Sequence, residues 1–411
     1  MILFYLLITV MPLTRHPFWE IFVGELTLIK YLGVGCLLYA FGYAVVRESP
    51  LRLFETWQAR CFALLALLGM ASWVIMGSPT RWETSPFMSY VSFLSLFYIT
   101  VAVVDSPSRL RNVVLAAIGS VALASLYVLR EWQKYHGIYR NFRPGWVTGD
   151  PNYFTVSALL CLPVAFYMLQ GERPKWEKVL CLGGLVMTVF AVILGASRGG
   201  FLGLLAASLL VVWRTRRRVR NLTIVGALLL SFSLVLPTSP VERLLQPSPG
   251  DDEAVEVRKA VWRAGLRMVW ENPLTGIGLG NFKQMVGSYG DQDQSLERIA
   301  HNTYIEIAAE LGLPGLFAFL GILFGSFYTL EQVRRKTSNS GQSLLHQVAQ
   351  GIQAGLVSYM VASFFVSAHY QKLFWLMIFL TICLPALERE TSTGKVGGQR
   401  KPRQIAGVLG D

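Results

Sequence analysis

A histidine stands where a polar stretch of about sixty residues ends in this 411-residue chain. The stretch covers residues 239–300, and His301-Asn302-Thr303-Tyr304 follows it at the start of a long apolar run. An imidazole changes charge near neutral pH, so it could take or give a proton there. Single histidines are more often structural, but the other four lack this setting: His16, His136, His346 and His369. His301 is therefore the candidate catalytic residue.

An arginine lies within an amphipathic helix that we expect over residues 254–271 and that Asn272-Pro273 ends. A guanidinium among apolar side chains needs a carboxylate or an anionic substrate as its partner, and Arg258 leaves both open. The expected apolar face around it carries Val255, Val261, Trp262, Gly265, Leu266 and Val269, with a separate basic stripe of Lys259, Arg263 and Arg267 beside it.

A second arginine, Arg198, follows the apolar run 179–196 and precedes Gly199, Gly200 and another apolar run. A guanidinium at such a helix end either snorkels to the interface or serves an anion. The glycine pair indicates a tight turn, and it could also let backbone N–H groups approach a phosphate.

A further polar element precedes the apolar run that begins near residue 153. It carries Arg140, Arg143 and Gly149-Asp150-Pro151-Asn152-Tyr153. Asn152 fits either a turn or N-cap role or a contact to a substrate. Asn302 is similarly placed to cap a helix that begins after it. Arg143, Asp150, Asn152 and Asn302 are therefore candidate substrate contacts.

The composition indicates a membrane protein. Hydrophobic residues make up 53% of the chain, charged residues only 15%, and the mean hydropathy is +0.45, which is too apolar for an ordinary soluble globule. The net charge of +12 falls in short clusters between apolar runs, as orientation signals do, and this argues against nucleic-acid binding. The five cysteines lie in apolar segments without CxxC spacing, so we expect neither a disulfide framework nor a metal site.

The apolar runs predict an all-α polytopic membrane protein with about 11–12 transmembrane helices. No run alternates like a barrel strand, and we find no internal repeat. Pro314-Gly315 is expected to bend or break the run 303–330. The runs lie near residues 27–46, 61–77, 87–104, 112–129, 153–169, 179–196, 222–237, 303–330, 348–367 and 373–387, with shorter ones at 1–13 and 200–213.

The basic connections predict the orientation. Arg214 to Arg220 form the strongest cluster, which the positive-inside rule places in the cytoplasm. Counting outward places both termini there as well, with residues 1–13 as a retained hydrophobic segment. The opposite, extracytoplasmic face then receives residues 130–151, the turn at Arg198 and one large loop that ends at His301. The expected division is 1–237, transmembrane helices; 238–302, the large loop; 303–388, transmembrane helices; and 389–411, a disordered basic tail.

These pieces, in this order, resemble the O-antigen ligase and Wzy-type O-antigen polymerase family of bacterial membrane glycan-assembly proteins. The motifs span about residues 150–330. This family often has a His or Ser just before the catalytic histidine, where this chain has Ile299-Ala300. The blocks that carry the resemblance are Asp150-Pro151-Asn152, Ser197-Arg198-Gly199-Gly200, Arg258 with Trp262, Asn272-Pro273-Leu274-Thr275-Gly276-Ile277-Gly278-Leu279-Gly280-Asn281-Phe282, His301-Asn302-Thr303-Tyr304 and Glu310-Leu311-Gly312-Leu313-Pro314-Gly315.

The resemblance implies a GT-C-like glycosyltransferase that is metal-independent, inverting and free of cofactors. Its donor would be an undecaprenyl-diphosphate-linked glycan, and its acceptor a glycan or a lipid. By carry-over, His301 is the general base, while Arg198 and Arg258 bind the diphosphate. The product would be O-antigen, capsule or exopolysaccharide, made on the outer face of the bacterial inner membrane. Implied partners are membrane lipids, a chain-length regulator and a flippase.

Other functions stay open from the sequence. A polymerase extends another lipid-linked glycan, whereas a ligase transfers to lipid A core or to protein. A transporter is disfavoured because the apolar runs hold almost no acidic residues beyond Glu306 and Glu310 and show no inverted repeat. A non-catalytic scaffold would tolerate replacement of His301, Arg198 and Arg258.

Overall fold

The structure is a computed structural model that describes residues 1–13, 22–23, 26–46, 51–77, 85–135, 138, 142–145, 150–214, 251–290, 298–338 and 343–397. The predicted span 222–237, most of the Arg214 to Arg220 cluster and the tail from residue 398 lie outside the described residues.

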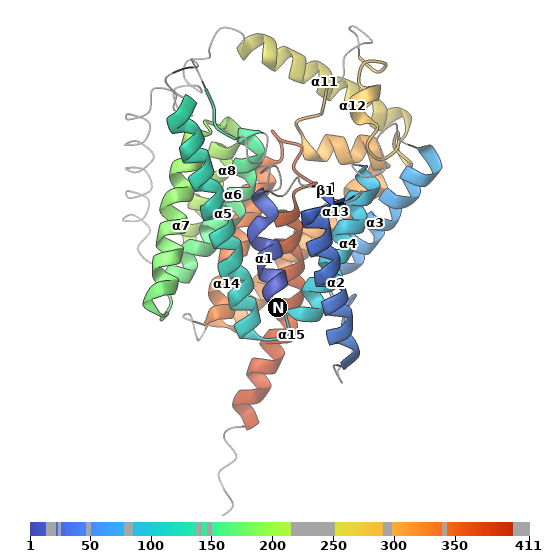
Figure 1. The fold of residues 1–411 in the computed structure, drawn as a ribbon. Coiled ribbons are helices and arrows are strands. Elements are labelled where there is room, and N and C mark those ends of the chain that lie inside the picture. The colour runs from blue at the N-terminus through green and yellow to red at the C-terminus, as the bar shows by residue number, and fades with distance from the viewer. Residues whose placement is uncertain are drawn as a thin grey trace, which may run out of the picture.

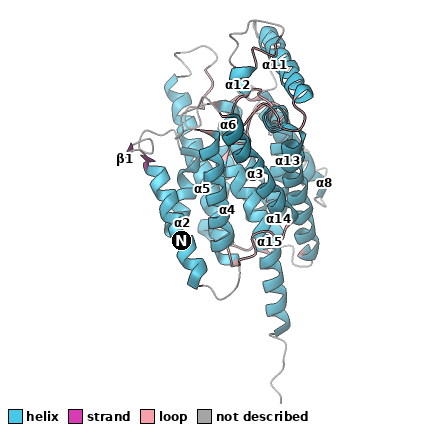
Figure 2. Cartoon of the chain, turned by 90° about the vertical axis from the view of Figure 1, so that its right-hand side faces the viewer, coloured by secondary structure: helices cyan, strands magenta, loops and turns pink. Residues whose placement is uncertain are grey.

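Helices dominate the described chain (Figures 1 and 2). The only strands among the described residues are β1 (Phe22–Val23) and β2 (Leu26–Thr27), which pair antiparallel. A 3-10 turn, Met11–Leu13, follows the first helix. The helices are α1 (Ile2–Val10), α2 (Leu28–Val46), α3 (Trp57–Met76), α4 (Pro86–Val103), α5 (Pro107–Tyr135), α6 (Pro151–Leu169), α7 (Lys175–Leu194), α8 (Arg198–Arg214), α11 (Asp251–Glu271), α12 (Phe282–Met285), α13 (Thr303–Lys336), α14 (Leu344–Ala362) and α15 (Lys372–Gly397).

Every apolar run predicted within the described residues coincides with one of these helices, including the short runs 1–13 and 200–213. By length and composition, seven of the described helices could each cross a membrane: α2, α3, α4, α5, α6, α7 and α13. The chain is thus an all-α polytopic membrane protein, as predicted. α15 continues to Gly397, beyond residue 388 where the transmembrane part was expected to end.

Short polar side chains begin several helices. Ser85 caps α4 by accepting a hydrogen bond from the Met88 N–H, and Ser343 caps α14 through the His346 N–H. Asp150 and Asn302 cap α6 and α13 in the same way. These caps satisfy N–H groups that have no acceptor inside the helix, so they define where each helix starts.

The bundle has two distinct ends. α11 and α12 lie across one end, which we call the α11 end, and the last turns of α15 protrude from the other, the α15 end (Figure 1). Because consecutive helices run in alternating directions, the described residues 142–145 and 150, and the segments at residues 195–198 and 363–371, share the α11 end with His301. The sequence predicted that the first two of these segments would share one face with the histidine.

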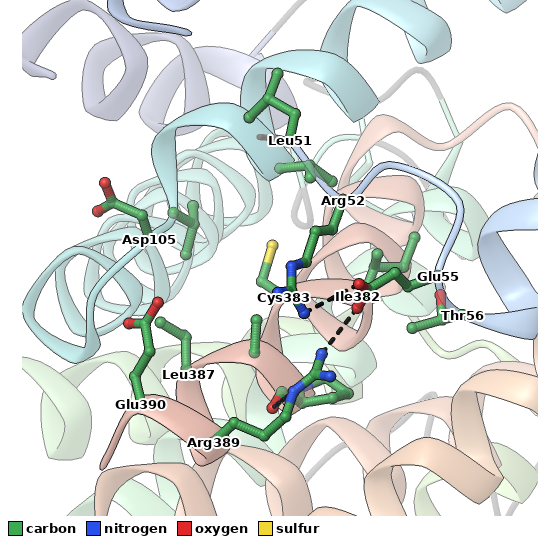
Figure 3. A pocket seen from close by; sticks show the side chains of 14 residues that line it. Leu51, Arg52, Glu55, Thr56, Asp105, Ile382, Cys383, Leu387, Arg389 and Glu390 are labelled. Carbon is green, nitrogen blue, oxygen red and sulfur yellow. Dashed lines mark hydrogen bonds and ion pairs between the residues drawn. The ribbon is translucent and has the colours of Figure 1, made fainter. Parts of the chain in front are cut away.

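Cations at the α15 end are paired with carboxylates. Glu331 on α13 binds Arg334 at 2.7 Å and Arg214 at 3.3 Å. A cavity of about 280 Å³ lies among the start of α3, the end of α4 and α15 (Figure 3). On its wall, Glu55 binds Arg52 at 3.0 Å and Arg389 at 2.8 Å. Two of these contacts join distant elements: Arg214 links α8 to α13, and Arg389 links α15 to the segment before α3.

α13 is broken at Gly312, where φ is +68° and ψ is −174°. Leu313 donates its N–H to Pro273 at 2.8 Å instead of to the preceding helical turn, and Pro314 has no N–H. The carbonyls of Ala309 and Glu310 thereby lose their helical donors. The predicted break is confirmed, and it begins two residues before Pro314.

The loop after α11 replaces the missing donors. Ile277 donates its N–H to the Ala309 carbonyl at 2.8 Å, and Gly278 donates to the Glu310 carbonyl at 3.1 Å. The Glu310 carboxylate also accepts from the Phe282 N–H at 3.3 Å. Two of the sequence blocks are therefore joined through backbone hydrogen bonds, which satisfy polar groups that would be costly to bury unpaired.

Gly276 permits this close approach. Its φ is +66°, and a Cβ at this position would lie 2.3 Å from the Glu310 carbonyl. Replacing Gly276 with alanine combines left-handed strain with overpacking, and we expect a loss of about 2–4 kcal/mol in stability. Thermal unfolding of the purified protein measures this as a lower melting temperature.

The matched control for this substitution is Gly42→Ala, because a Cβ at Gly42 would meet nothing within 4 Å. Gly42 lies inside helix α2, so this variant should melt at or slightly above the wild-type temperature. Equal melting temperatures for Gly276→Ala and Gly42→Ala would contradict the role given to the joined loop.

Candidate functional site

His301 adopts a left-handed backbone conformation, with φ of +48°. Such a conformation costs a non-glycine residue of order 1–3 kcal/mol and persists only where the surroundings impose it. His301 is half-buried and lies two residues before α13. The contacts on both sides of it supply the constraint.

The peptide before His301 is held from two directions. The Trp262 indole N–H, on α11, donates to the Ala300 carbonyl at 2.9 Å. The Glu306 carboxylate, on α13, accepts a hydrogen bond from the Ala300 N–H, and the Ser367 hydroxyl donates to the same carboxylate. We call this arrangement the Ala300 clamp. It joins α11, α13 and the segment between α14 and α15 at the residue that precedes the histidine.

The residues after His301 are fixed equally firmly. The Asn302 side-chain oxygen accepts from the N–H groups of Tyr304 at 3.0 Å and Ile305 at 3.1 Å. Thr303 donates its N–H to the Ser363 carbonyl at 2.9 Å. Asn302 is therefore the N-cap of α13, as predicted, and its amide oxygen is occupied by this role.

α11 rests on the start of α13 through a stripe that differs from the expected one. Val255 and Leu266, which were assigned to the apolar face, are 41% and 58% exposed, so this assignment was wrong. The buried stripe consists of Val261, Ala264, Gly265 and Met268. A Cβ on Gly265 would lie 2.5 Å from Ile305, so the absence of a side chain sets how closely the two helices approach. Small residues at this contact carry little weight in a hydrophobic pattern, which explains the error.

Arg258 precedes this buried stripe by one helical turn and is half-buried. Burial lowers its pKa, the nearby Arg198 lowers it further, and Asp150 acts in the opposite direction. A guanidinium remains charged despite such a shift. Arg258 on α11 therefore lies close enough to Arg198 on α8 for their charges to interact. The Asp150 carboxylate interacts with Arg258 as well.

His301 belongs to the same neighbourhood. Burial lowers the pKa of its imidazole, the charges of Arg258 and Arg298 lower it further, and Asp150 opposes them. The imidazole is consequently neutral at pH 7, which is the form that can accept a proton. The sequence interpretation did not select Arg298, because this exposed residue at the end of the polar stretch has no pattern around it.

Arg143 is a brace between loops. Its Nε–H donates to the Gly195 carbonyl at 2.8 Å, and its second guanidinium arm donates to the Asn152 side-chain oxygen at 3.1 Å. Asp150 caps α6 by accepting from the N–H groups of Asn152 at 2.6 Å and Tyr153 at 3.4 Å. Arg143 and Asn152 thus tie the start of α6 to the turn before Arg198.

The turn before Arg198 is tightly packed. Ala196 is left-handed, with φ of +44°, and the Ser197 hydroxyl accepts from the Gly200 N–H at 3.2 Å. A Cβ on Gly200 would lie 2.1 Å from Thr155, and one on Gly199 would lie 2.7 Å from Phe365. The glycine pair does not form the predicted turn: Gly199 and Gly200 lie in the first turn of helix α8, where both are buried against neighbouring side chains.

The assembled site holds two guanidinium groups and a neutral imidazole at the α11 end. Such a set can bind an anion and remove a proton next to it. Among the described residues, no group of three or more His, Cys, Asp or Glu side chains could hold a metal ion.

Part of the chain matches a known family model. Residues 183–320 match the family model Wzy_C, described as O-antigen ligase, and this range includes Arg198, Arg258 and His301. No curated protein matches the chain significantly. The family match confirms the resemblance that the sequence motifs indicated. The chain is thus a polytopic membrane protein whose residues 183–320 are similar to the Wzy_C domain of the O-antigen ligase family.

Proposed function

We propose that this protein is a membrane glycosyltransferase that transfers or polymerises an undecaprenyl-diphosphate-linked glycan. The observation that carries the proposal is the meeting of Arg198, Arg258 and His301, which are far apart in sequence, at one end of the bundle within the family domain. The basic residues at the α15 end support a cytoplasmic position for that end. The site then faces the extracytoplasmic side of a bacterial plasma membrane.

The proposed reaction is a substitution at the anomeric carbon of the donor. The acceptor hydroxyl transfers its proton to His301 as its oxygen forms the new glycosidic bond. The bond between the anomeric carbon and the diphosphate breaks, and its electron pair leaves with the diphosphate. Arg198 and Arg258 stabilise the charge that develops on that group, since guanidinium groups match phosphate oxygens in shape and charge. Attack from the opposite face inverts the configuration and requires no metal ion.

The acceptor distinguishes two forms of this function. Growth of a lipid-linked ladder of products identifies a polymerase, whereas a single transfer to lipid A core or protein identifies a ligase. We favour the polymerase, because no feature of the described site selects a special acceptor.

Loss of the proposed base or of an arginine should abolish transfer while the protein stays folded. We expect His301→Ala to lower the rate about 10²–10⁴-fold and Arg258→Ala about 10²–10³-fold. The measurement is glycan transfer by purified protein in nanodiscs that are supplied with a lipid-diphosphate oligosaccharide. Arg263→Ala is the control, since Arg263 is an exposed arginine on the same helix. Transfer at the wild-type rate by folded His301→Ala would refute the assignment of the base.

The pH profile tests whether His301 titrates in the reaction. Because the neutral imidazole is the active form, activity should fall as the pH drops through the lowered pKa. Arg298→Gln removes a positive charge, so the acid limb of kcat/KM should move to higher pH. Asp150→Asn removes a negative charge and should move this limb to lower pH, while asparagine can still cap α6. Shifts in the same direction, or none, would exclude His301 as the titrating group.

The Ala300 clamp should affect the rate more than substrate binding. Trp262→Phe keeps an aromatic ring but removes the N–H that holds the Ala300 carbonyl. A lost hydrogen bond of about 0.5–1.5 kcal/mol predicts a roughly 2–10-fold lower kcat with little change in KM. Trp270→Phe is the matched control, because Trp270 lies on the same helix and is 86% exposed. If both variants lowered kcat equally, the clamp would have no specific role.

A further inference from the structure

A groove with a volume of about 280 Å³ lies among α1, α2 and α4, away from His301 and the two arginines. α1 and α2 stand side by side in Figure 1 and contact each other. Only 11% of the apolar span of α2 is buried, and Val34 on the groove wall is 48% exposed. The groove is therefore on the flank of the bundle, where a membrane protein meets lipid. Its lining is formed by Leu7, Met11, Ile29, Lys30, Gly33, Val34, Leu37, Ser85, Met88, Ser89, Val91, Ser92, Ser95, Leu96, Ile99 and Lys372.

Two lysines lie at the mouth of the groove, which is at the α11 end. Lys372 is the first residue of α15, and Lys30 is in the first turn of α2. The two ammonium groups are close enough to repel each other. Lys372 forms no ion pair or hydrogen bond with the described residues, although it is half-buried. An ammonium group in such a position is stabilised by an anion.

The rest of the groove wall presents apolar groups to a bound molecule. The hydroxyl groups of Ser89, Ser92 and Ser95 donate to carbonyls of their own helix, at 3.5, 2.8 and 2.9 Å, so they do not present free donors to the groove. From Ile29 to Leu37 the lining follows α2 for about 12 Å at 1.5 Å per residue. The groove thus has a cationic mouth at the membrane surface and an apolar floor that runs inward.

We propose that this groove binds an anionic phospholipid. Its phosphate lies between Lys30 and Lys372, and one acyl chain lies along the floor beside Val34, Leu96 and Ile99. A soluble anion would leave the apolar floor unfilled. The lining contains no Asp or Glu to receive the ammonium group of a zwitterionic lipid, so a net negative headgroup is favoured. This binding does not depend on the proposed glycan transfer.

Native mass spectrometry of the full chain tests the proposal with two probes, dioleoyl phosphatidylglycerol and dioleoyl phosphatidylcholine. Wild type should retain phosphatidylglycerol at least about tenfold more than phosphatidylcholine, consistent with a charge contribution of about 1 kcal/mol or more per lysine. Lys372→Gln should lose this preference. Lys283→Gln, which changes an exposed lysine on α12, should retain it. Equal retention of phosphatidylglycerol by Lys372→Gln and wild type would overturn the proposal.

A second pair of variants tests the floor without removing a charge. A Cβ at Gly33 or at Gly42 meets nothing within 4 Å, but only Gly33 lines the groove. Gly33→Leu should fold normally and exclude the acyl chain, whereas Gly42→Leu, on the same helix, should bind lipid like wild type. Equal lipid retention by both variants would overturn the proposal. Displacement of phosphatidylglycerol by an equal concentration of undecaprenyl phosphate would overturn the assignment of the occupant.

Discussion

The break in α13 is the constraint on which the candidate site depends. Gly312 and Pro314 deprive the Ala309 and Glu310 carbonyls of helical donors, and such groups cannot stay unpaired in a buried helix. Ile277 and Gly278 supply the N–H groups from the loop after α11. Through this exchange the loop is fixed to α13, and α11 is brought over the residues that precede it.

The first half of α13 then acts as a platform for the histidine. Asn302 caps it, Glu306 holds the Ala300 N–H, and Trp262 of α11 holds the Ala300 carbonyl. The left-handed conformation of His301 is imposed by these neighbours, since an isolated chain would avoid it. In this way a helix break and a clamp together define the backbone position of one imidazole.

The charged neighbours of the arginines differ between the two ends of the bundle. At the α15 end, Glu331 binds three arginines and Glu55 binds two, so these cations are compensated. At the α11 end, the largest influence on Arg258 after burial is another cation, Arg198. Like charges held together in a half-buried place oppose folding unless an anion joins them. The closeness of Arg198 and Arg258, with Asp150 acting on Arg258 in the opposite direction, is the charge arrangement on which the proposed diphosphate site rests.

The sequence by itself determined the features that depend on local chemistry. The apolar runs defined the helices, the cap at Asn302 followed from its residue type, and Pro314-Gly315 indicated the break. Only the tertiary structure decided which cations meet, which face of α11 is buried and why Gly199 and Gly200 are glycines. Gly265 faces Ile305 and Trp262 reaches Ala300, each across about forty residues of chain. Local sequence patterns indicate which side of a segment faces water or lipid. They do not identify the residue from a distant segment that will contact it.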